Sequence, residues 1–390
     1  MAEDTFPKTA VLSIWFCWLF LILPRMIVPP LLPLIEKEFT LSHEDAALLM
    51  SVYMLSYALM QLPAGSLSDR FGNKYFIILS IFGACLPIVL MPLTSTFESL
   101  LVLQIVSGLS AGLYYVPSTT YITQSTSIKN RGMALGLVFT GGSFASILIS
   151  LLINFFPIQE YGWRSLFALC AIPGVLFTPI LLLTLKDRIR EDTNHRDLDL
   201  ESFLRGLKNP QLVMLILYNL VSSLSGWSLT TFIPTFFVLE KGLTVSATAL
   251  LMLAYYFTSA MSGPLSGTVA RRLGLRVPGF LAAVAMCIVS FATPLSYTPV
   301  AIVLVLAVWG LIGGLSWSPY NVLLIELVPQ NLRGTFLGIF NLTGFLSGTV
   351  GPVLFGRVAD TAGFGAFFTL SLLLSVVSTI FSIAIIKLRS

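Results

Sequence analysis

Arg25 is the residue whose chemistry is least expected in its surroundings, because it lies inside an apolar run that extends from about residue 10 to residue 34. An arginine at the centre of a bilayer costs about 2.5–3.5 kcal/mol on insertion scales. No Asp or Glu falls in the middle of any apolar run of the sequence. A cation in such surroundings favours an anionic ligand. We therefore predict that Arg25 binds an anion; the structural alternatives are an ion pair with another helix and extension of the side chain toward the membrane surface.

A second set of polar side chains lies on one face of the run from 46 to 64. Tyr53, Tyr57 and Gln61 recur every four residues, which places them on the same side of a helix. Their phenol and amide groups can donate hydrogen bonds to a carboxylate. Further polar or aromatic residues of the apolar runs are Tyr115, Trp227, Tyr255, Tyr256, Trp317, Tyr320, Asn321 and Asn341. Helix packing explains each aromatic residue singly, but as a group they predict a binding cavity around one arginine.

The runs that carry these residues are long enough to cross a membrane. Of the 390 residues, 56% are hydrophobic and 10% are charged, whereas a soluble globular chain is about 25% charged. This composition excludes a soluble enzyme, a nucleic-acid-binding protein and a disordered scaffold. A membrane-spanning helix needs about 20 apolar residues. Twelve such runs are present, at 10–34, 46–64, 75–93, 99–123, 132–156, 165–185, 210–238, 246–268, 277–293, 299–325, 335–356 and 366–386.

The basic residues indicate how the chain is oriented. An even number of spans places both termini on one side of the membrane. With the N-terminus inside, seventeen Lys and Arg residues lie in cytoplasmic segments and four lie in outer segments. Cytoplasmic loops carry an excess of Lys and Arg. The sequence therefore predicts a multi-pass protein of the cell membrane, the inner membrane in a bacterium, with both termini in the cytoplasm.

The chain divides into two six-helix bundles, residues 1–185 and 210–390. A polar cytoplasmic linker at 186–209, with a short amphipathic helix near 198–207, joins them. The two halves repeat each other with a constant offset of 202 residues. The matched pairs include Tyr53 and Tyr255, Gly65 and Gly267, Arg70 and Arg272, Gly72 and Gly274, Gly108 and Gly310, Gly112 and Gly314, Pro117 and Pro319, and Gly142 and Gly344. A parallel repeat of this kind is typical of a transporter that rocks around a site at the membrane midplane.

Glycines recur in the fourth, fifth, tenth and eleventh runs. Small residues let membrane helices approach one another closely. We therefore expect close helix packing at Gly108, Gly112, Gly136, Gly141, Gly142, Gly310, Gly314, Gly344 and Gly348.

The loop at 65–74 reads GSLSDRFGNK. It resembles the signature loop of the major facilitator superfamily, in which a Gly, an Asp-Arg pair, a second Gly and basic residues join helices two and three. The repeat-related loop at 267–276, GTVARRLGLR, keeps the frame but has Arg271 in place of the acid. The resemblance covers the whole chain. It implies an all-α integral membrane fold with twelve transmembrane helices in two pseudo-symmetric six-helix bundles.

We interpret these two loops as gating elements. The glycines allow a tight turn, and an aspartate can accept hydrogen bonds from a helix N-terminus or a guanidinium. The positive-inside rule alone explains the basic residues but not the acid or the glycines. Glu326 is expected to pair with a nearby arginine. The predicted gating residues are Gly65, Asp69, Arg70, Gly72, Lys74, Arg271, Arg272, Glu326 and Arg333.

The first two runs resemble two branches of the superfamily, the organophosphate:phosphate antiporters and the anion:cation symporters. The residues that carry this resemblance are Arg25, Pro33, Glu36, Tyr57, Gln61, Asp69 and Arg70. In both branches an arginine at the position of Arg25 binds the anionic group. This chain lacks the second arginine of the first branch, and it has Pro24 and Gly112 where the second branch has acids. We therefore expect a carboxylate rather than a phosphate ester, moved by a gradient or by exchange.

Together these observations predict a transporter that moves a small organic anion by alternating access, and not an enzyme. A membrane hydrolase would need a His, Asp or metal cluster within the spans, and a sensor would need a larger soluble domain than the linker provides. The four cysteines lie in apolar runs without metal-binding spacing. No metal, cofactor or nucleic acid is expected, and the protein is expected to be a monomer in the lipid bilayer. The alternative function is a drug or lipid exporter of the same superfamily in which Arg25 is structural.

Overall fold

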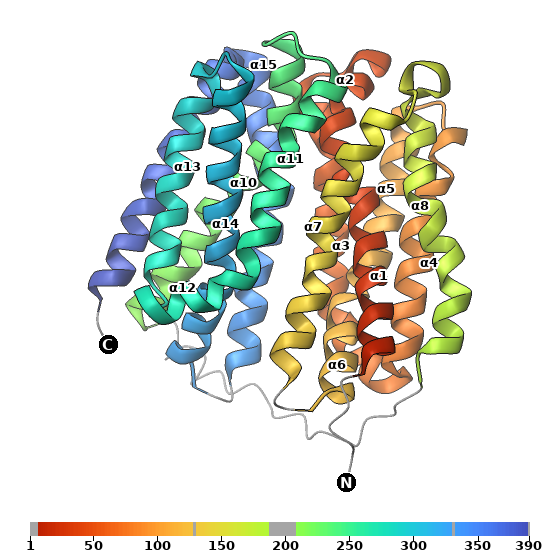
Figure 1. Ribbon diagram of the computed structural model, residues 1–390, viewed down its shortest axis with the longest axis vertical. Helices are drawn as coiled ribbons and strands as arrows, with labels where there is room; N and C mark the ends of the chain where they lie inside the picture. Colours follow the sequence, from red (N-terminus) through yellow and green to blue (C-terminus); the bar gives the residue numbers. More distant parts are fainter. Residues whose placement is uncertain (1–6, 128–129, 187–207, 330–331, 389–390) are drawn as a thin grey trace. The chain divides into compact units, whose positions relative to one another are not determined.

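The computed structural model describes residues 7–127, 130–186, 208–329 and 332–388, which form helices and no strand (Figure 1). The chain divides into two compact units. Unit 1 comprises residues 1–41 and 48–193, and unit 2 comprises residues 42–47 and 194–390. The boundary at 193–194 falls within the segment expected to be the linker. The amphipathic helix expected near 198–207 lies outside the described residues.

Unit 1 is built from helices that pack mainly around α1 and α4. In this unit α1 packs against α7 and α8, and α4 packs against α5 and α8. The elements are α1 (Lys8–Met26), α2 (Val28–Phe39), α3 (His43–Phe71), α4 (Asn73–Val89), the 3-10 turn η1 (Met91–Leu93), α5 (Phe97–Gly112), α6 (Tyr115–Ser125), α7 (Arg131–Phe155) and α8 (Ile158–Thr184).

Unit 2 contains two prominent helix pairs, α10 with α15 and α11 with α14, and α13 packs against both α14 and α15. Its elements are α10 (Pro210–Leu239), α11 (Val245–Ser262), the 3-10 turn η3 (Gly263–Leu265), α12 (Ser266–Leu273), α13 (Val277–Leu295), α14 (Pro299–Leu327) and α15 (Arg333–Lys387).

The described part of the chain has ten helical segments that are long and apolar enough to cross a membrane. These ten segments contain eleven of the twelve predicted runs, because the segment Thr335–Lys387 contains two of them. The run at 46–64 lies within α3, and the runs at 335–356 and 366–386 are the two parts of α15. Between these parts Gly363 has a φ of +77°, a left-handed conformation that interrupts the helical path. All twelve predicted runs are therefore helical.

The first run is not one helix but two, because its prolines interrupt it. Helix α1 ends at Met26 and α2 begins at Val28, with Ile27 between them. Pro29 and Pro30 have no backbone N–H. The carbonyl groups of Arg25 and Met26, four residues earlier, therefore cannot accept the usual helical hydrogen bonds. The interruption places Arg25 in the last turn of α1.

Glycines bring α5 against α3 in unit 1 and α14 against α11 in unit 2, at positions related by the offset of 202. A Cβ atom added at Gly108 would lie 2.5 Å from the carbonyl oxygen of Tyr53, and one at Gly310 would meet the carbonyl oxygen of Tyr255. One helical turn later, Gly112 faces the carbonyl of Tyr57 and Gly314 faces the carbonyl of Ser259. The repeat read in the sequence is thus a repeat of helix contacts.

Close packing also holds at three further predicted glycines, where an added Cβ would come within 3.4 Å of another helix: Gly141, Gly142 and Gly348. Gly344 makes an ordinary van der Waals contact. At Gly136 the expectation is wrong, since an added Cβ would meet nothing within 4 Å. This glycine lies on a face of α7 that no neighbouring helix approaches closely.

A closed cluster of phenylalanine side chains forms part of the core of unit 2. Successive members of this group have ring centroids 4.8–5.9 Å apart. None is more than 6% exposed. The members of this phenylalanine cluster are Phe232, Phe236, Phe355, Phe364, Phe367 and Phe368. The cluster is a close-packed part of the core that contains only hydrocarbon rings.

We expect Gly108→Ala to lower the midpoint of thermal unfolding in detergent. The new methyl group would meet the backbone of Tyr53, which cannot move as a side-chain tip can. Overpacking of this kind costs roughly 1–3 kcal/mol. The matched control is Gly136→Ala, which should leave the midpoint unchanged. Equal midpoints for the two variants would contradict the assignment of Gly108 as a helix-packing position.

Candidate functional site

Arg25 is 7% exposed and lies in the last turn of α1. The carbonyl groups at the C-terminal end of a helix favour a positive charge. The proline interruption at α1–α2 therefore creates a local position in which a guanidinium is better tolerated than in a continuous helix. The repeat-related position in unit 2, 202 residues later, is Trp227. At these two related positions, unit 1 thus has a cation and unit 2 an aromatic ring.

The structure brings Arg25 together with the tyrosines predicted on the second run. Tyr53 and Tyr57 of α3 both interact electrostatically with Arg25. Their rings are stacked with centroids 6.4 Å apart, and the two side chains are 3% and 4% exposed. Gln61, one helical turn after Tyr57, is half-buried. One cation and a line of neutral polar groups therefore occur side by side.

Tyr115 extends this group toward α6, where it is the first helical residue. It is half-buried and interacts electrostatically with Tyr57. Its ring lies 6.5 Å from that of Trp18 on α1. Trp18 was not among the residues predicted from the sequence. It could have been included, because it precedes Arg25 by seven residues and so lies on the same helix face.

The candidate residues of unit 2 form a separate set. The Tyr255 ring lies 4.3 Å from that of Trp309. Trp227 is half-buried and lies beside Gly348. The remaining members are Asn321 and Asn341, both half-buried, the buried Tyr256 and Tyr320, and Trp317, whose side chain lies outside the described part.

Buried polar contacts in unit 2 that the sequence did not indicate hold its helices together. The Asn219 amide of α10 donates to the Phe340 carbonyl at 2.7 Å and to the Thr343 hydroxyl at 2.9 Å. The Ser371 hydroxyl lies 2.7 Å from the hydroxyl of Ser225 and 2.7 Å from that of Ser290. Because these groups satisfy one another inside the unit, we assign them to helix packing.

The two signature loops have the tight turns that their glycines predict. Gly72, between α3 and α4, has a φ of +92°, and the repeat-related Gly274, after α12, has a φ of +86°. Arg70 is exposed, with its guanidinium 5.2 Å from the centre of the Phe71 ring. The Asp69 side chain lies outside the described part, so its latch role stays a prediction.

The other predicted gating residues take positions near these loops. Gly65 makes an ordinary contact with Val116, Lys74 is half-buried, and Arg272 is exposed. The expected pairing of Glu326 is wrong for the described side chains. Arg333 instead donates to the Ile325 carbonyl at 3.1 Å, and Arg271 donates to the Thr268 hydroxyl at 3.1 Å. Glu326 is exposed.

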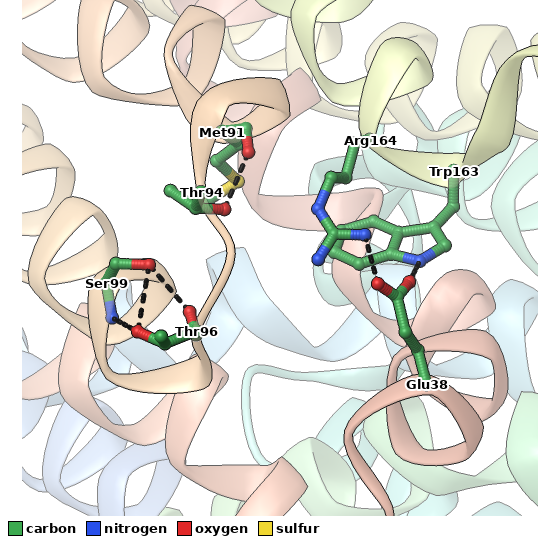
Figure 2. Close-up of polar contacts among 7 residues, drawn as sticks. All are labelled: Glu38, Met91, Thr94, Thr96, Ser99, Trp163 and Arg164. Carbon is green, nitrogen blue, oxygen red and sulfur yellow. Dashed lines mark hydrogen bonds and ion pairs between the residues drawn. The ribbon is translucent and has the colours of Figure 1, made fainter.

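A polar cluster ties the end of α2 to the start of α8 (Figure 2). One Glu38 oxygen accepts from the Trp163 indole at 2.7 Å, and the other pairs with Arg164. The Arg164 guanidinium also lies over the rings of Trp163 and Phe39, at 4.4 Å and 5.3 Å. Charged hydrogen bonds and cation–π contacts of this kind reinforce one another. The C-terminal part of the first run is therefore held to α8 independently of α1.

The family model of the Major Facilitator Superfamily matches residues 14–352. The chain belongs to this superfamily. The all-α membrane fold expected from the signature loop is thereby confirmed, as is a transporter with many membrane-spanning helices.

Two curated relatives from this superfamily have different substrates. The chain is 23% identical to the cis,cis-muconate transport protein of Acinetobacter baylyi, over 85% of this chain and 82% of that protein. It is 24% identical to the multidrug resistance protein MdtG of Escherichia coli, over 88% of this chain and 86% of that protein. At these identities the relatives leave the substrate of this chain open.

Two solved structures share the fold. A bacterial homologue of the human lysosomal transporter Spinster, in an inward-facing and occupied conformation, superposes with a TM-score of 0.77 at 17% identity, covering 99% of this chain and 98% of that one. The nucleoside transporter NupG superposes with a TM-score of 0.81 at 14% identity, covering 98% of this chain and 100% of that one. At these identities the likeness is one of fold.

We expect Glu38→Gln to lower the thermal unfolding midpoint by a small, salt-dependent amount. Partly exposed ion pairs contribute about 0.2–1 kcal/mol, and high salt screens them. The difference from the unmodified protein should therefore shrink in about 1 M sodium chloride. The control is Glu240→Gln, because Glu240 is exposed and has no ion-pair partner among the described residues. A Glu38→Gln effect that does not change with salt would argue against the ion pair.

Proposed function

We propose that this superfamily member moves a small organic anion, a carboxylate, across the cell membrane by alternating access. The observation that supports the proposal is the position of Arg25, buried in the last turn of α1 beside Tyr53 and Tyr57. The middles of the apolar runs contain no acidic residue. A guanidinium can form two parallel hydrogen bonds with a carboxylate, and phenol groups can add further donors.

In this proposal Arg25 binds the carboxylate, and Tyr57 and Gln61 donate hydrogen bonds to the rest of the anion. One guanidinium offsets one negative charge, which favours a carboxylate over a dianionic phosphate ester. A bound carboxylate places a negative charge beside the Arg25 guanidinium in the apolar interior. The change between the inward-open and outward-open conformations is then least costly when the anion is bound to Arg25. This couples binding to the conformational change. A solute gradient or the exchange of one anion for another would drive transport.

The relatives support two substrate classes. The muconate transport protein is named for a dicarboxylate, which shares the carboxylate group proposed to bind Arg25 but carries two of them. MdtG, at nearly the same identity, is named for multidrug resistance. If this chain is instead an exporter of drugs or lipids, Arg25 has a structural role at the end of α1 and substrate affinity does not depend on its charge.

Substitution of Arg25 distinguishes the two functions. In proteoliposomes we expect Arg25→Ala to abolish uptake of the carboxylate found by a thermal-shift screen of small organic acids. Arg25→Lys keeps the charge but not the planar fork of donors, and we expect it to reduce uptake roughly tenfold to a hundredfold, on the scale of 1.4 kcal/mol per factor of ten. Circular dichroism and the unfolding midpoint should show that both variants fold.

Gln104→Asn provides a matched control, because it changes another buried polar residue of a unit 1 helix, one outside the proposed site. Its uptake should stay near that of the unmodified protein. Carboxylate uptake that is unchanged in Arg25→Ala would reject the proposed site. Unchanged export of several unrelated amphipathic compounds by Arg25→Ala would support the exporter function instead.

The proposed orientation has a direct test. Both termini are expected in the cytoplasm, because basic residues are concentrated in the segments on that side. A fluorescent protein fused after Ser390 should therefore fluoresce in intact cells, and alkaline phosphatase at the same place should be inactive. High phosphatase activity with a dark fluorescent fusion would reverse the orientation.

A further inference from the structure

Four aromatic residues of unit 1 form a group of which only Tyr115 was predicted as part of the binding cavity. We define the Trp18 cluster as Trp18, Tyr114, Tyr115 and Phe139, which come from α1, the α5–α6 junction, α6 and α7. The Trp18 ring is stacked on Tyr114 with centroids 5.6 Å apart and meets Phe139 edge-on at 5.7 Å. The Tyr115 ring is stacked on Phe139 at 5.8 Å. The four rings therefore form one continuous aromatic surface.

This cluster is continuous with the surroundings of Arg25. Trp18 and Arg25 are seven residues apart on α1, which places them on one face of the helix and about 10 Å apart along its axis. Tyr57 interacts electrostatically with both Arg25 and Tyr115. A path of polar and aromatic groups thus leads from the guanidinium through Tyr57 to the Trp18 cluster, within a single unit.

The Trp18 cluster differs from the phenylalanine cluster of unit 2 in two respects. It is partly open, since Phe139 is 36% exposed and Trp18 and Tyr115 are half-buried. It also contains a donor, the Tyr115 hydroxyl, that bonds to no other described residue. The Trp18 indole nitrogen instead lies against α7, where a Cβ added at Gly142 would come within 2.9 Å of it. A donor left facing hydrocarbon is costly. The Tyr115 hydroxyl is therefore suited to a polar part of a guest molecule.

Tyr114 and Trp15 show what structural aromatic residues look like in the same region. The Tyr114 hydroxyl donates to the Ile14 carbonyl at 2.7 Å, and the side chain is 1% exposed. The Trp15 indole N–H donates to the Thr140 hydroxyl at 3.0 Å. Their polar atoms are used within the unit. Tyr114 thus supports the Trp18 ring from behind, while Trp18, Tyr115 and Phe139 offer surface.

We infer that the anion bound at Arg25 is a monocarboxylate with a planar, aromatic or conjugated body whose far end carries a hydrogen-bond acceptor. This inference rests on the proposed function and adds the class of substrate. The carboxylate pairs with Arg25, the planar body lies against the Trp18 cluster, and the acceptor receives a hydrogen bond from the Tyr115 hydroxyl. A neutral donor at the far end suits a hydroxyl, ether or carbonyl oxygen better than a second carboxylate, because the site has one cation.

The test compares three acids of similar size by calorimetric binding to the purified protein. Benzoate and cyclohexanecarboxylate differ in the planarity of the ring, and 4-methoxybenzoate adds an acceptor at the far end. We expect affinity to fall in the order 4-methoxybenzoate, benzoate, cyclohexanecarboxylate. Because an aromatic pair contributes about 0.5–1.5 kcal/mol, the step from benzoate to cyclohexanecarboxylate should be roughly threefold to tenfold.

Three variants connect this preference to the Trp18 cluster. Trp18→Leu should remove the preference for benzoate over cyclohexanecarboxylate. Trp18→Phe keeps the ring and should retain the affinity order, whereas Tyr115→Phe should lose only the gain from the methoxy oxygen. Both serve as the test if Trp18→Leu does not fold. The matched control is Trp15→Phe, one turn earlier on α1, which should leave all three affinities unchanged because its indole N–H already bonds to Thr140.

The outcomes separate this inference from the proposed function. If benzoate and cyclohexanecarboxylate bind equally, and both are lost in Arg25→Ala, the planar substrate is wrong and the carboxylate site stands. If the affinity order holds but is unchanged in all three cluster variants, the cluster does not recognise the substrate. If no carboxylate binds in a manner that depends on Arg25, both the inference and the proposed function are rejected.

Discussion

The burial of one guanidinium in the apolar interior of unit 1 is the constraint from which the rest of the candidate site follows. Arg25 is 7% exposed, yet it lies where the carbonyl ends of α1 and the hydroxyl dipoles of Tyr53 and Tyr57 favour its charge. A protein carboxylate paired with Arg25 would compete with an anionic substrate for the guanidinium.

The internal repeat gives both units similar helix contacts, and the two units differ in the polar residues that these helices carry. Glycines bring equivalent helices together at Gly108 and Gly310, where side chains would keep them apart. Within this shared frame, unit 1 has Arg25 where unit 2 has Trp227. Unit 2 also buries its amide and hydroxyl groups in bonds between its own helices, as at Asn219. Under the proposed function, charge recognition belongs to unit 1.

The sequence predicted those features that depend on neighbours along the chain. Arg25, the Tyr53–Tyr57 stripe and the turn at Gly72 could be identified because helical spacing and hydropathy are local properties. Contacts between distant residues could not be identified in this way. Glu38 and Arg164 are 126 positions apart, and the Trp18 cluster joins three separate helices. The local pattern also misled at Gly136, whose helix face has no close neighbour, and at Glu326, whose expected partners bond elsewhere.

The interruption of the first run has a mechanical consequence. Because Pro29 and Pro30 cannot donate, two of the hydrogen bonds that would stiffen the junction between α1 and α2 cannot form. The junction can therefore bend at a smaller cost than an unbroken helix, while Glu38 keeps the far end of α2 attached to α8. A small tilt of α8 would then move α2 about its junction with α1, which lies two residues after Arg25. The proline pair thus allows the surroundings of Arg25 to change while α1 stays helical.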